Sequence, residues 1–251
     1  ECLPGPCFPG IGDLLLVPEG TQISVGYGDG VPSAQPQGED PLCGKTILWL
    51  GSSVTYGAAA AGHYSMVNAI EDRHPGSICE KYAISGTTLV NDADDSYVSR
   101  LMLIPKDRKT DLMVVQLSTN DASQGKPMGR ISEGFDRRLF DDRTIAGAIE
   151  TIIAYTHETF HCPVIFYTGT YCEKEHYAEM VDLLLRIRIK WNIGVIDLFH
   201  HPEMTAVYGT AQYERYMADP IHPNRAGYIE WWTPVMDAFL SAFMTDQAKR
   251  A

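Results

Sequence analysis

The sequence predicts an α/β domain built on a five-stranded parallel sheet with helices on both faces. Short apolar segments, mostly β-branched or aromatic, recur from Lys45 onward, and segments with helical spacing separate them. Strands that alternate with helices need right-handed crossovers, which make the sheet parallel and cover both of its faces. The chain has 251 residues, 45% of them hydrophobic, which is enough to bury a full core.

The order of the elements follows from these segments. Strands are expected near residues 46–50, 79–84, 111–117, 163–168 and 193–197. Helices are expected near 63–74, 95–104, 143–160, 174–190 and 225–243, with a further helix beginning at the alanine run 58–61. The stretch 178–189 places apolar residues at helical spacing and charges on the other face. In such a sheet, ligands bind beyond the carboxyl ends of the strands, where the strand order reverses.

Residues 1–44 differ in composition from the rest of the chain. Pro and Gly recur there, and the sustained apolar stretches are limited to 14–17 and 23–25. We interpret 1–44 as an N-terminal arm or linker with short strands, and 45–247 as the catalytic domain. The arm would pack on this domain or on a second protomer, so a homo-oligomer formed through 1–44 is one expectation.

Composition excludes several classes of partner. The formal net charge of −12 argues against a phosphate-binding surface, so no nucleic acid is expected. No apolar run approaches the ~20 residues of a membrane span. Cys2 and Cys7 bracket a short loop and are one candidate pair, but most of the six cysteines are expected to be reduced. The compartment stays open, with the cytoplasm slightly favoured over secretion. The chain begins at Glu1, so a removed leader is not excluded.

Two short segments carry the chemistry. Residues 51–57, GSSVTYG, follow a buried strand and place Ser53 in a glycine-framed turn. Residues 219–224, DPIHPN, place Asp219 and His222 three residues apart in a loop that prolines stiffen. A serine hydroxyl is a poor nucleophile until a base removes its proton, and the base needs an orienting partner. Because the segments supply all three groups, the sequence predicts serine hydrolase chemistry.

The same segments belong to a longer pattern of four blocks. With them, the chain resembles the SGNH (GDSL-like) hydrolase superfamily, whose members are esterases, lipases and deacetylases on a flavodoxin-like sheet. The resemblance covers about four fifths of the chain. Its blocks are Gly51-Ser52-Ser53 with Gly57, then Gly86, then Ser118-Thr119-Asn120-Asp121, and finally Asp219, His222 and Pro223. Three positions depart from the family pattern: Ser52 replaces an Asp, Ser118 replaces a Gly, and Thr88 or a neighbour stands where a further glycine is frequent.

The resemblance implies a role for each matching residue. Ser53 would be the nucleophile, His222 the general base, and Asp219 the group that orients the imidazole. The oxyanion hole would consist of the backbone N–H groups of Ser53 and Gly86 and the side chain of Asn120. Asp121, beside Asn120, is expected to be structural, and no cofactor is implied.

The expected function is a serine-dependent carboxylic-ester hydrolase that forms an acyl-enzyme. Small-molecule or carbohydrate esters, such as O-acetyl groups, are the expected substrates, with Tyr56, Tyr208 and Met217 as candidate substrate contacts. A lysophospholipase or thioesterase that uses the same site is one alternative. A catalytically inert, carbohydrate-binding protein with the same fold is another, which the departures at Ser52 and Ser118 motivate.

Metal and dinucleotide sites are not expected. Cys172 and His176 lie four residues apart, but no third ligand stands at metal-binding spacing. The glycine-rich segment 26–30 is followed by Pro32 and Pro36 where a dinucleotide-binding helix would begin. Neither motif therefore points to a cofactor.

Overall fold

The computed structural model describes residues 40–250. Its centre is a single parallel sheet with strand order β2-β1-β3-β4-β5. This order is that of the flavodoxin-like doubly wound fold, as expected. Every neighbouring pair is parallel, and the register places Leu50 of β1 opposite Tyr82 of β2 and Val115 of β3. The strands are β1 Thr46–Gly51, β2 Ile78–Ala83, β3 Leu112–Gln116, β4 Val164–Tyr167 and β5 Gly194–Ile196.

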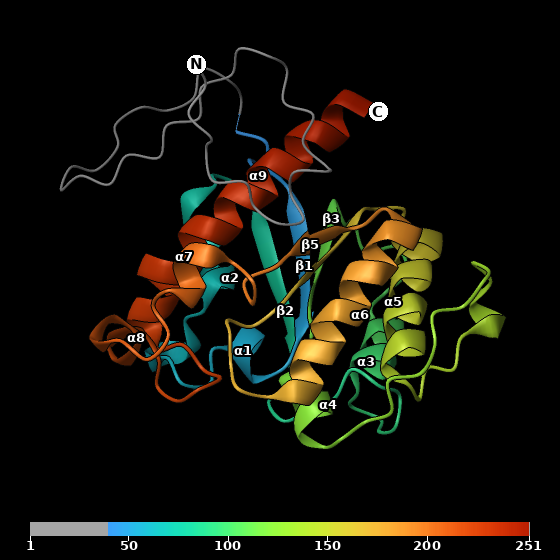
Figure 1. Cartoon of the computed structure of the whole chain (residues 1–251). Coiled ribbons are helices and arrows are strands. Elements are labelled where there is room, and N and C mark those ends of the chain that lie inside the picture. Colours follow the sequence, from blue (N-terminus) through green and yellow to red (C-terminus); the bar gives the residue numbers. More distant parts are fainter. Residues whose placement is uncertain (1–39, 251) are drawn as a thin grey trace, which may run out of the picture.

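Helices cover both faces of the sheet and make a three-layer domain (Figure 1). On one face lie α3 (Tyr97–Leu103), α5 (Ile145–Phe160) and α6 (Glu175–Trp191). On the other lie α2 (Met66–Arg73) and the C-terminal pair η3 (Gly227–Trp232) and α9 (Thr233–Arg250). The shorter helices are α1 Ser53–Tyr56, η1 Ala61–His63, α4 Thr119–Ser123, η2 Arg137–Leu139, α7 Pro202–Thr205 and α8 Ala211–Tyr216.

The alternation of side chains along β1 divides the core into two layers. Leu48 and Leu50 belong to the cluster beneath α3, α5 and α6. Ile47 and Trp49 point the other way, into the cluster beneath α2, η3 and α9. All four are completely buried, because both faces of a parallel sheet are covered. The short apolar segment of β1 therefore lies at the centre of the domain.

The expected helix at residues 58–61 is wrong. Gly57 has φ +84 and ends α1 after a single turn. The chain then turns back so closely that a side chain at Gly57 would come within 2.7 Å of the His63 carbonyl. Residues 58–60 form a turn, and η1 follows with Gly62 at φ +70. The left-handed backbone conformations of Gly57 and Gly62 therefore outweigh the high helix propensity of the alanines between them.

The expected arm, 1–44, lies mostly outside the described residues. Its last five residues form a turn on the domain, in which Leu42 is completely buried. The Asp40 carboxylate lies 2.9 Å from His74 Nδ1, and His74 Nε2 lies 2.9 Å from Asp237 of α9. The body of the domain thus begins before residue 45, and its last helix continues to Arg250.

The strand order reverses between β1 and β3, and this arrangement positions the site. From β1 the chain moves outward to β2, and from β3 it moves the other way to β4 and β5. The short helices α1 and α4 directly follow β1 and β3 at the carboxyl edge of the sheet, which is the lower edge in Figure 1. Ser53 begins α1 and Asn120 lies in α4, so the reversal brings them to one crevice.

Candidate active site

The candidate nucleophile, Ser53, stands at the first position of α1, directly beyond β1. The turn is so tight that a Cβ at Gly51 would lie 1.7 Å from Thr55 Oγ1, so only glycine fits there. Ser53 is 8% exposed. The turn therefore presents one small hydroxyl at the edge of the sheet while its neighbours stay buried.

A buried amide holds this turn in place. Gln116 ends β3, and its Oε1 accepts hydrogen bonds from the backbone N–H of Ser52 at 3.0 Å and of Thr55 at 3.2 Å. The Thr55 hydroxyl donates to the same oxygen at 2.8 Å and lies 2.6 Å from the Tyr167 hydroxyl of β4. Ser53 is thus fixed between two anchored N–H groups.

The loop between α8 and η3 brings the acid and the base to Ser53. His222 Nε2 lies 2.7 Å from Ser53 Oγ, and His222 Nδ1 lies 2.7 Å from Asp219 Oδ2. The loop is closed by the Ala218 N–H, which donates to the His222 carbonyl, and by an antiparallel bridge between Met217 and Pro223. The Ser53 hydroxyl, the His222 imidazole and the Asp219 carboxylate therefore form one hydrogen-bonded chain, the geometry that nucleophilic acyl transfer needs.

Asp219 is held as a carboxylate. Partial desolvation acts to raise its pKa, but hydrogen bonds from the Ile221 N–H and from His222 outweigh it, so the pKa lies below the usual value. Both N–H bonds end on Oδ1, at 2.8 Å and 2.9 Å. Oδ2 is left to face the imidazole, which favours the tautomer with its proton on Nδ1. In that tautomer Nε2 is free to accept the Ser53 proton.

Two candidate oxyanion donors, Gly86 and Asn120, lie in the segments that follow β2 and β3. Gly86 follows β2 with φ +84, and its N–H enters no backbone hydrogen bond within the described residues. The Asn120 side chain donates one N–H to the Thr87 carbonyl at 2.8 Å. An amide carries two N–H groups, so the second is available for a ligand. Asp121 is completely buried and accepts from the N–H groups of Leu89 and Val90, as its expected structural role requires.

Comparison with known proteins assigns the family. A family model described as the GDSL-like lipase/acylhydrolase family matches residues 49–228. The chain belongs to this family. It is thereby an ester hydrolase in the broad sense, as the sequence analysis predicted. No curated protein matches the chain.

Solved structures share the fold of this GDSL-like hydrolase at low identity. A possible lipase from Chitinophaga pinensis is 17% identical, with a TM-score of 0.59, and the match covers 81% of this chain and 99% of that one. A member of the lipolytic G-D-S-L family from Veillonella parvula is 16% identical, with a TM-score of 0.56 over 77% and 95%. A two-domain esterase active on acetylated mannans, co-crystallised with mannopentaose, is 18% identical, with a TM-score of 0.55, and this chain spans half its length.

In this GDSL-like hydrolase, a buried guanidinium contacts the loop that carries Gly86. Arg100 of α3 is 8% exposed. Its Nη2 donates to the Gly51 carbonyl at 2.8 Å and to Thr87 Oγ1 at 3.0 Å. Its other nitrogens donate to the carbonyls of Tyr82 and Asp95. One side chain thus ties the ends of β1 and β2 to the loop that carries Gly86.

Sequence reasoning missed Gln116 and Arg100, although each left a signal. Gln116 is a polar residue at the end of an otherwise apolar strand, Leu112–Gln116. Arg100 falls among the buried positions of α3, beside Leu101 and one turn beyond Tyr97. A polar side chain on a buried face must find hydrogen-bond partners there. Both residues find theirs in the loops of the active site.

The expected substrate contacts occupy different environments. Tyr56 is half-buried and its ring lies 4.4 Å from that of His63. Tyr208 is half-buried among other aromatic rings near the Asp219–His222 loop. Met217 is 7% exposed and packs in the core cluster beneath that loop, which argues against a direct contact of its side chain with substrate.

A small cavity lies beside Ser53, between the carboxyl ends of β3 and β4. Its volume is about 10 Å³, room for about one water molecule. The cavity is lined by the chain neighbours of Ser53, Asn120 and His222, which are Val54, Thr119 and Ile221. Its other lining residues are Gln116, Tyr167, Gly169, Thr170, Cys172 and Pro220.

The described residues show neither a metal-binding cluster nor a membrane span. Within 40–250, no three His, Cys, Asp or Glu side chains gather as ligands would. His176, considered above with Cys172, instead has Nε2 2.9 Å from the Lys126 carbonyl oxygen. None of the helices in this part of the chain is long and apolar enough to cross a membrane.

Proposed function

We propose that the chain is a serine-dependent carboxylic-ester hydrolase that acts through an acyl-enzyme on short-chain esters. The observation that carries the proposal is the contact of 2.7 Å between Ser53 Oγ and His222 Nε2, with Asp219 on the far side of the imidazole. A general base must lie within hydrogen-bond reach of the proton that it removes. These three groups meet that condition before substrate binds.

In the proposed mechanism, Ser53 Oγ attacks the carbonyl carbon while its proton passes to His222 Nε2. The oxyanion receives hydrogen bonds from the N–H groups of Ser53 and Gly86 and from the Asn120 amide, and each such donor is worth ~3–4 kcal/mol by precedent. The carbon–oxygen bond to the alcohol then breaks, and His222 returns the proton to the departing oxygen. A water molecule then repeats these steps. His222 takes a proton from the water, and the resulting hydroxide attacks the acyl carbon. The bond between that carbon and Ser53 Oγ breaks, His222 returns the proton to Ser53, and the acid is released.

Short acyl groups are the proposed acyl half of the ester. The cavity of about 10 Å³ lined by the chain neighbours of Ser53 and Asn120 has room for about one water molecule, so it offers no space for a long acyl chain. O-acetyl groups of carbohydrates are therefore a substrate class to test first. The likeness to an esterase active on acetylated mannans points to the same class, although at 18% identity it carries the fold alone.

The test compares p-nitrophenyl acetate, butyrate and octanoate with wild type, Ser53→Ala and the control Ser241→Ala on α9. We expect turnover of acetate by wild type and the control, and its loss in Ser53→Ala. Unchanged turnover in Ser53→Ala would refute the serine mechanism. Faster cleavage of octanoate would favour the lysophospholipase or thioesterase alternative, and no activity at all would favour the inert carbohydrate-binding alternative.

The pH dependence gives an independent test of His222. Its protonated imidazolium form cannot accept the Ser53 proton, so the rate should fall in acid. A rate that stays flat between about pH 5 and 9 would contradict the proposed role.

A further inference from the structure

Three tyrosines form a continuous row of rings beside the Asp219–His222 loop. Tyr171 follows β4, Tyr208 follows α7, and Tyr213 lies in α8. The ring centres of Tyr171 and Tyr208 are 5.0 Å apart, and those of Tyr208 and Tyr213 are 5.2 Å apart. All three are half-buried. We call these residues the tyrosine row.

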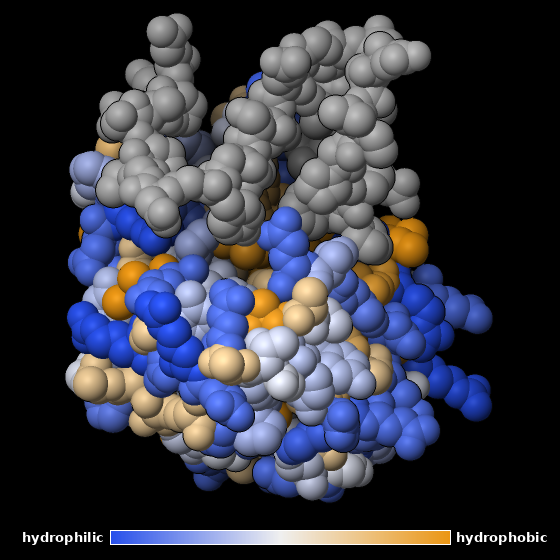
Figure 2. All heavy atoms as spheres, turned by 60° about the vertical axis from the view of Figure 1, so that its left-hand side comes forward, coloured by the Kyte–Doolittle hydropathy of each residue, from blue (hydrophilic) through white to orange (hydrophobic). Residues whose placement is uncertain are grey.

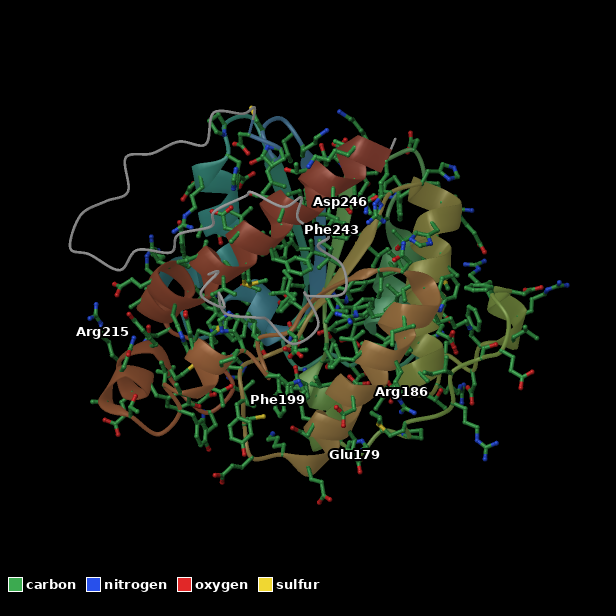
Figure 3. All side chains as sticks on the ribbon, turned by 45° about the horizontal axis from the view of Figure 1, so that its top comes forward. Glu179, Arg186, Phe199, Arg215, Phe243 and Asp246 are labelled. Atoms are coloured by element: carbon green, nitrogen blue, oxygen red, sulfur yellow. The ribbon has the colours of Figure 1, made fainter. Side chains whose placement is uncertain are left out.

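Buried aromatic residues hold both ends of the tyrosine row. Phe199, 4% exposed, lies 5.4 Å from the Tyr171 ring at one end. Trp231, 8% exposed, lies 6.3 Å from the Tyr213 ring at the other. Phe199 stands between α6 and the segment that carries α7 and α8 (Figure 3). The row is thus fixed in position, which lowers the entropy lost when it binds a ligand.

The row lies next to the catalytic machinery. The Tyr213 hydroxyl donates to the Pro220 carbonyl at 3.5 Å, between Asp219 and His222. Cys172, the neighbour of Tyr171, lines the small cavity beside Ser53 together with Pro220. In ester hydrolysis, His222 must reach the oxygen of the departing alcohol to return its proton. The alcohol half of the ester therefore lies on the His222 side, where the tyrosine row begins.

The chemistry of the row is amphipathic. Each ring offers an apolar face with negative π-density and a hydroxyl at its edge. The exposed His200 ring, which packs against Phe199, adds a polar group beside the rings. A pyranose has the complementary surface, with C–H groups on its faces and hydroxyls around its rim. The face of the molecule in Figure 2 is mainly hydrophilic where described residues are visible, with small separate hydrophobic areas.

We propose that the tyrosine row is a binding site for the sugar ring of the alcohol half of the ester, and that Tyr208, at its centre, is its main stacking residue. This inference rests on the proposed function, since it assigns the substrate class of the same site. It predicts that the enzyme prefers acetates of pyranoses over acetates of acyclic alcohols.

The experiment compares tetra-O-acetyl methyl glucopyranoside with triacetylglycerol, which carries the same acyl group without a ring. Acetate release is followed with wild type, Tyr208→Leu, Tyr208→Phe and the control Phe135→Leu. Phe135 is an exposed aromatic residue, 58% accessible, that packs on Trp191 at the far end of α6. The control thus removes an aromatic ring remote from the row.

We expect wild type to prefer the sugar acetate, and Tyr208→Leu to raise its KM about three- to tenfold with kcat unchanged. Tyr208→Phe should retain more of the preference for the sugar acetate than Tyr208→Leu, because it keeps the ring. Tyr208→Leu should change triacetylglycerol turnover much less than sugar acetate turnover, and Phe135→Leu should match wild type on both substrates. Equal losses on both substrates would mean that Tyr208 only supports the fold and would overturn the proposal. A wild-type enzyme that shows no preference for the sugar acetate would also overturn the proposal. An effect of Tyr208→Leu confined to p-nitrophenyl octanoate would overturn it as well, because it would assign the row to lipid chains. Failure of the proposed function is recognised separately, because Ser53→Ala would then keep its turnover.

Discussion

Replacing Gln116 by Met tests whether the nucleophile is positioned by a single buried oxygen. Met has nearly the same length and volume as Gln, so the substitution leaves the packing at the end of β3 almost unchanged. It removes the acceptor of three hydrogen bonds, from the N–H groups of Ser52 and Thr55 and from the Thr55 hydroxyl. The hydroxyl keeps a partner in Tyr167, but the two N–H groups have no replacement among the described residues.

The expected cost follows from burial. Ser52 and Thr55 are both completely buried, and a buried donor without an acceptor costs about 1–3 kcal/mol. Two such donors give a loss of about 2–6 kcal/mol in the free energy of unfolding, or about 5–20 °C in Tm for a domain of this size. Because Ser53 lies between the two N–H groups, a shift of its hydroxyl should also lower kcat by about 10–100-fold.

The assay pairs thermal unfolding with p-nitrophenyl acetate hydrolysis. The control is Gln247→Met on α9, where no loop of the active site is attached, and it should match wild type in both. A Gln116→Met protein that melts within about 2 °C of wild type would refute the reasoning, since the three bonds would then contribute almost nothing. Lost stability with normal kcat would mean that Gln116 supports the fold without positioning Ser53.

Three further predictions test other contacts. Arg100→Lys keeps the charge but reaches fewer of the four acceptors, so kcat/KM should fall more than about tenfold, and a wild-type rate would contradict its positioning role. Burial raises the pKa of Cys79 and Cys162 to about 12, so site-resolved alkylation near about pH 8 should modify the exposed Cys43 and spare both until denaturant is added. Burial lowers the pKa of His157 below 6.5, so the unfolded chain binds more protons below that value and stability falls as the pH drops through 6.5. His157→Gln should flatten this part of the stability curve, and an unchanged curve would contradict the assignment.

The sequence was sufficient to predict the sheet because four of its five strands, β1, β3, β4 and β5, are buried along their whole length and are mostly apolar. The edge strand β2 is partly exposed and carries Glu80 and Lys81, but its position was also expected, and all five predicted segments match β1 to β5 within a few residues. The residues of the candidate triad were also predictable, since Ser53, Asp219 and His222 each lie in a short motif. These residues are far apart in the sequence, but the fold brings the loop before η3, which carries Asp219 and His222, to the end of β1, where Ser53 lies.

What holds the site could not be predicted, because it depends on side chains that meet across elements. Gln116 reaches Ser52 over 64 positions and Arg100 reaches Gly51 over 49. No local pattern fixes which loops such buried groups will contact. The failed helix at 58–61 has a different, local cause. Gly57 and Gly62 on either side of the alanine run adopt the left-handed region, which outweighs the helix propensity of alanine.

The departure at Ser118 bears on whether the site is intact. Where the family pattern has Gly, the Ser118 hydroxyl accepts the Asn120 N–H at 3.2 Å and caps α4. It also donates to the Thr87 carbonyl, the acceptor that orients the Asn120 amide. Gly at a helix N-cap costs only a few tenths of a kcal/mol relative to Ser, whereas Ala costs about 1 kcal/mol.

If capping is the role of Ser118, then Ser118→Gly should stay close to wild type in Tm and kcat, while Ser118→Ala loses about 1 kcal/mol of stability. Thermal melts and p-nitrophenyl acetate turnover of the two variants decide the point. Equal and larger losses in both would mean that the bond to Thr87 is essential. Under the capping interpretation, Ser and Gly are two solutions to one backbone requirement, so this departure gives no support to a catalytically inert protein.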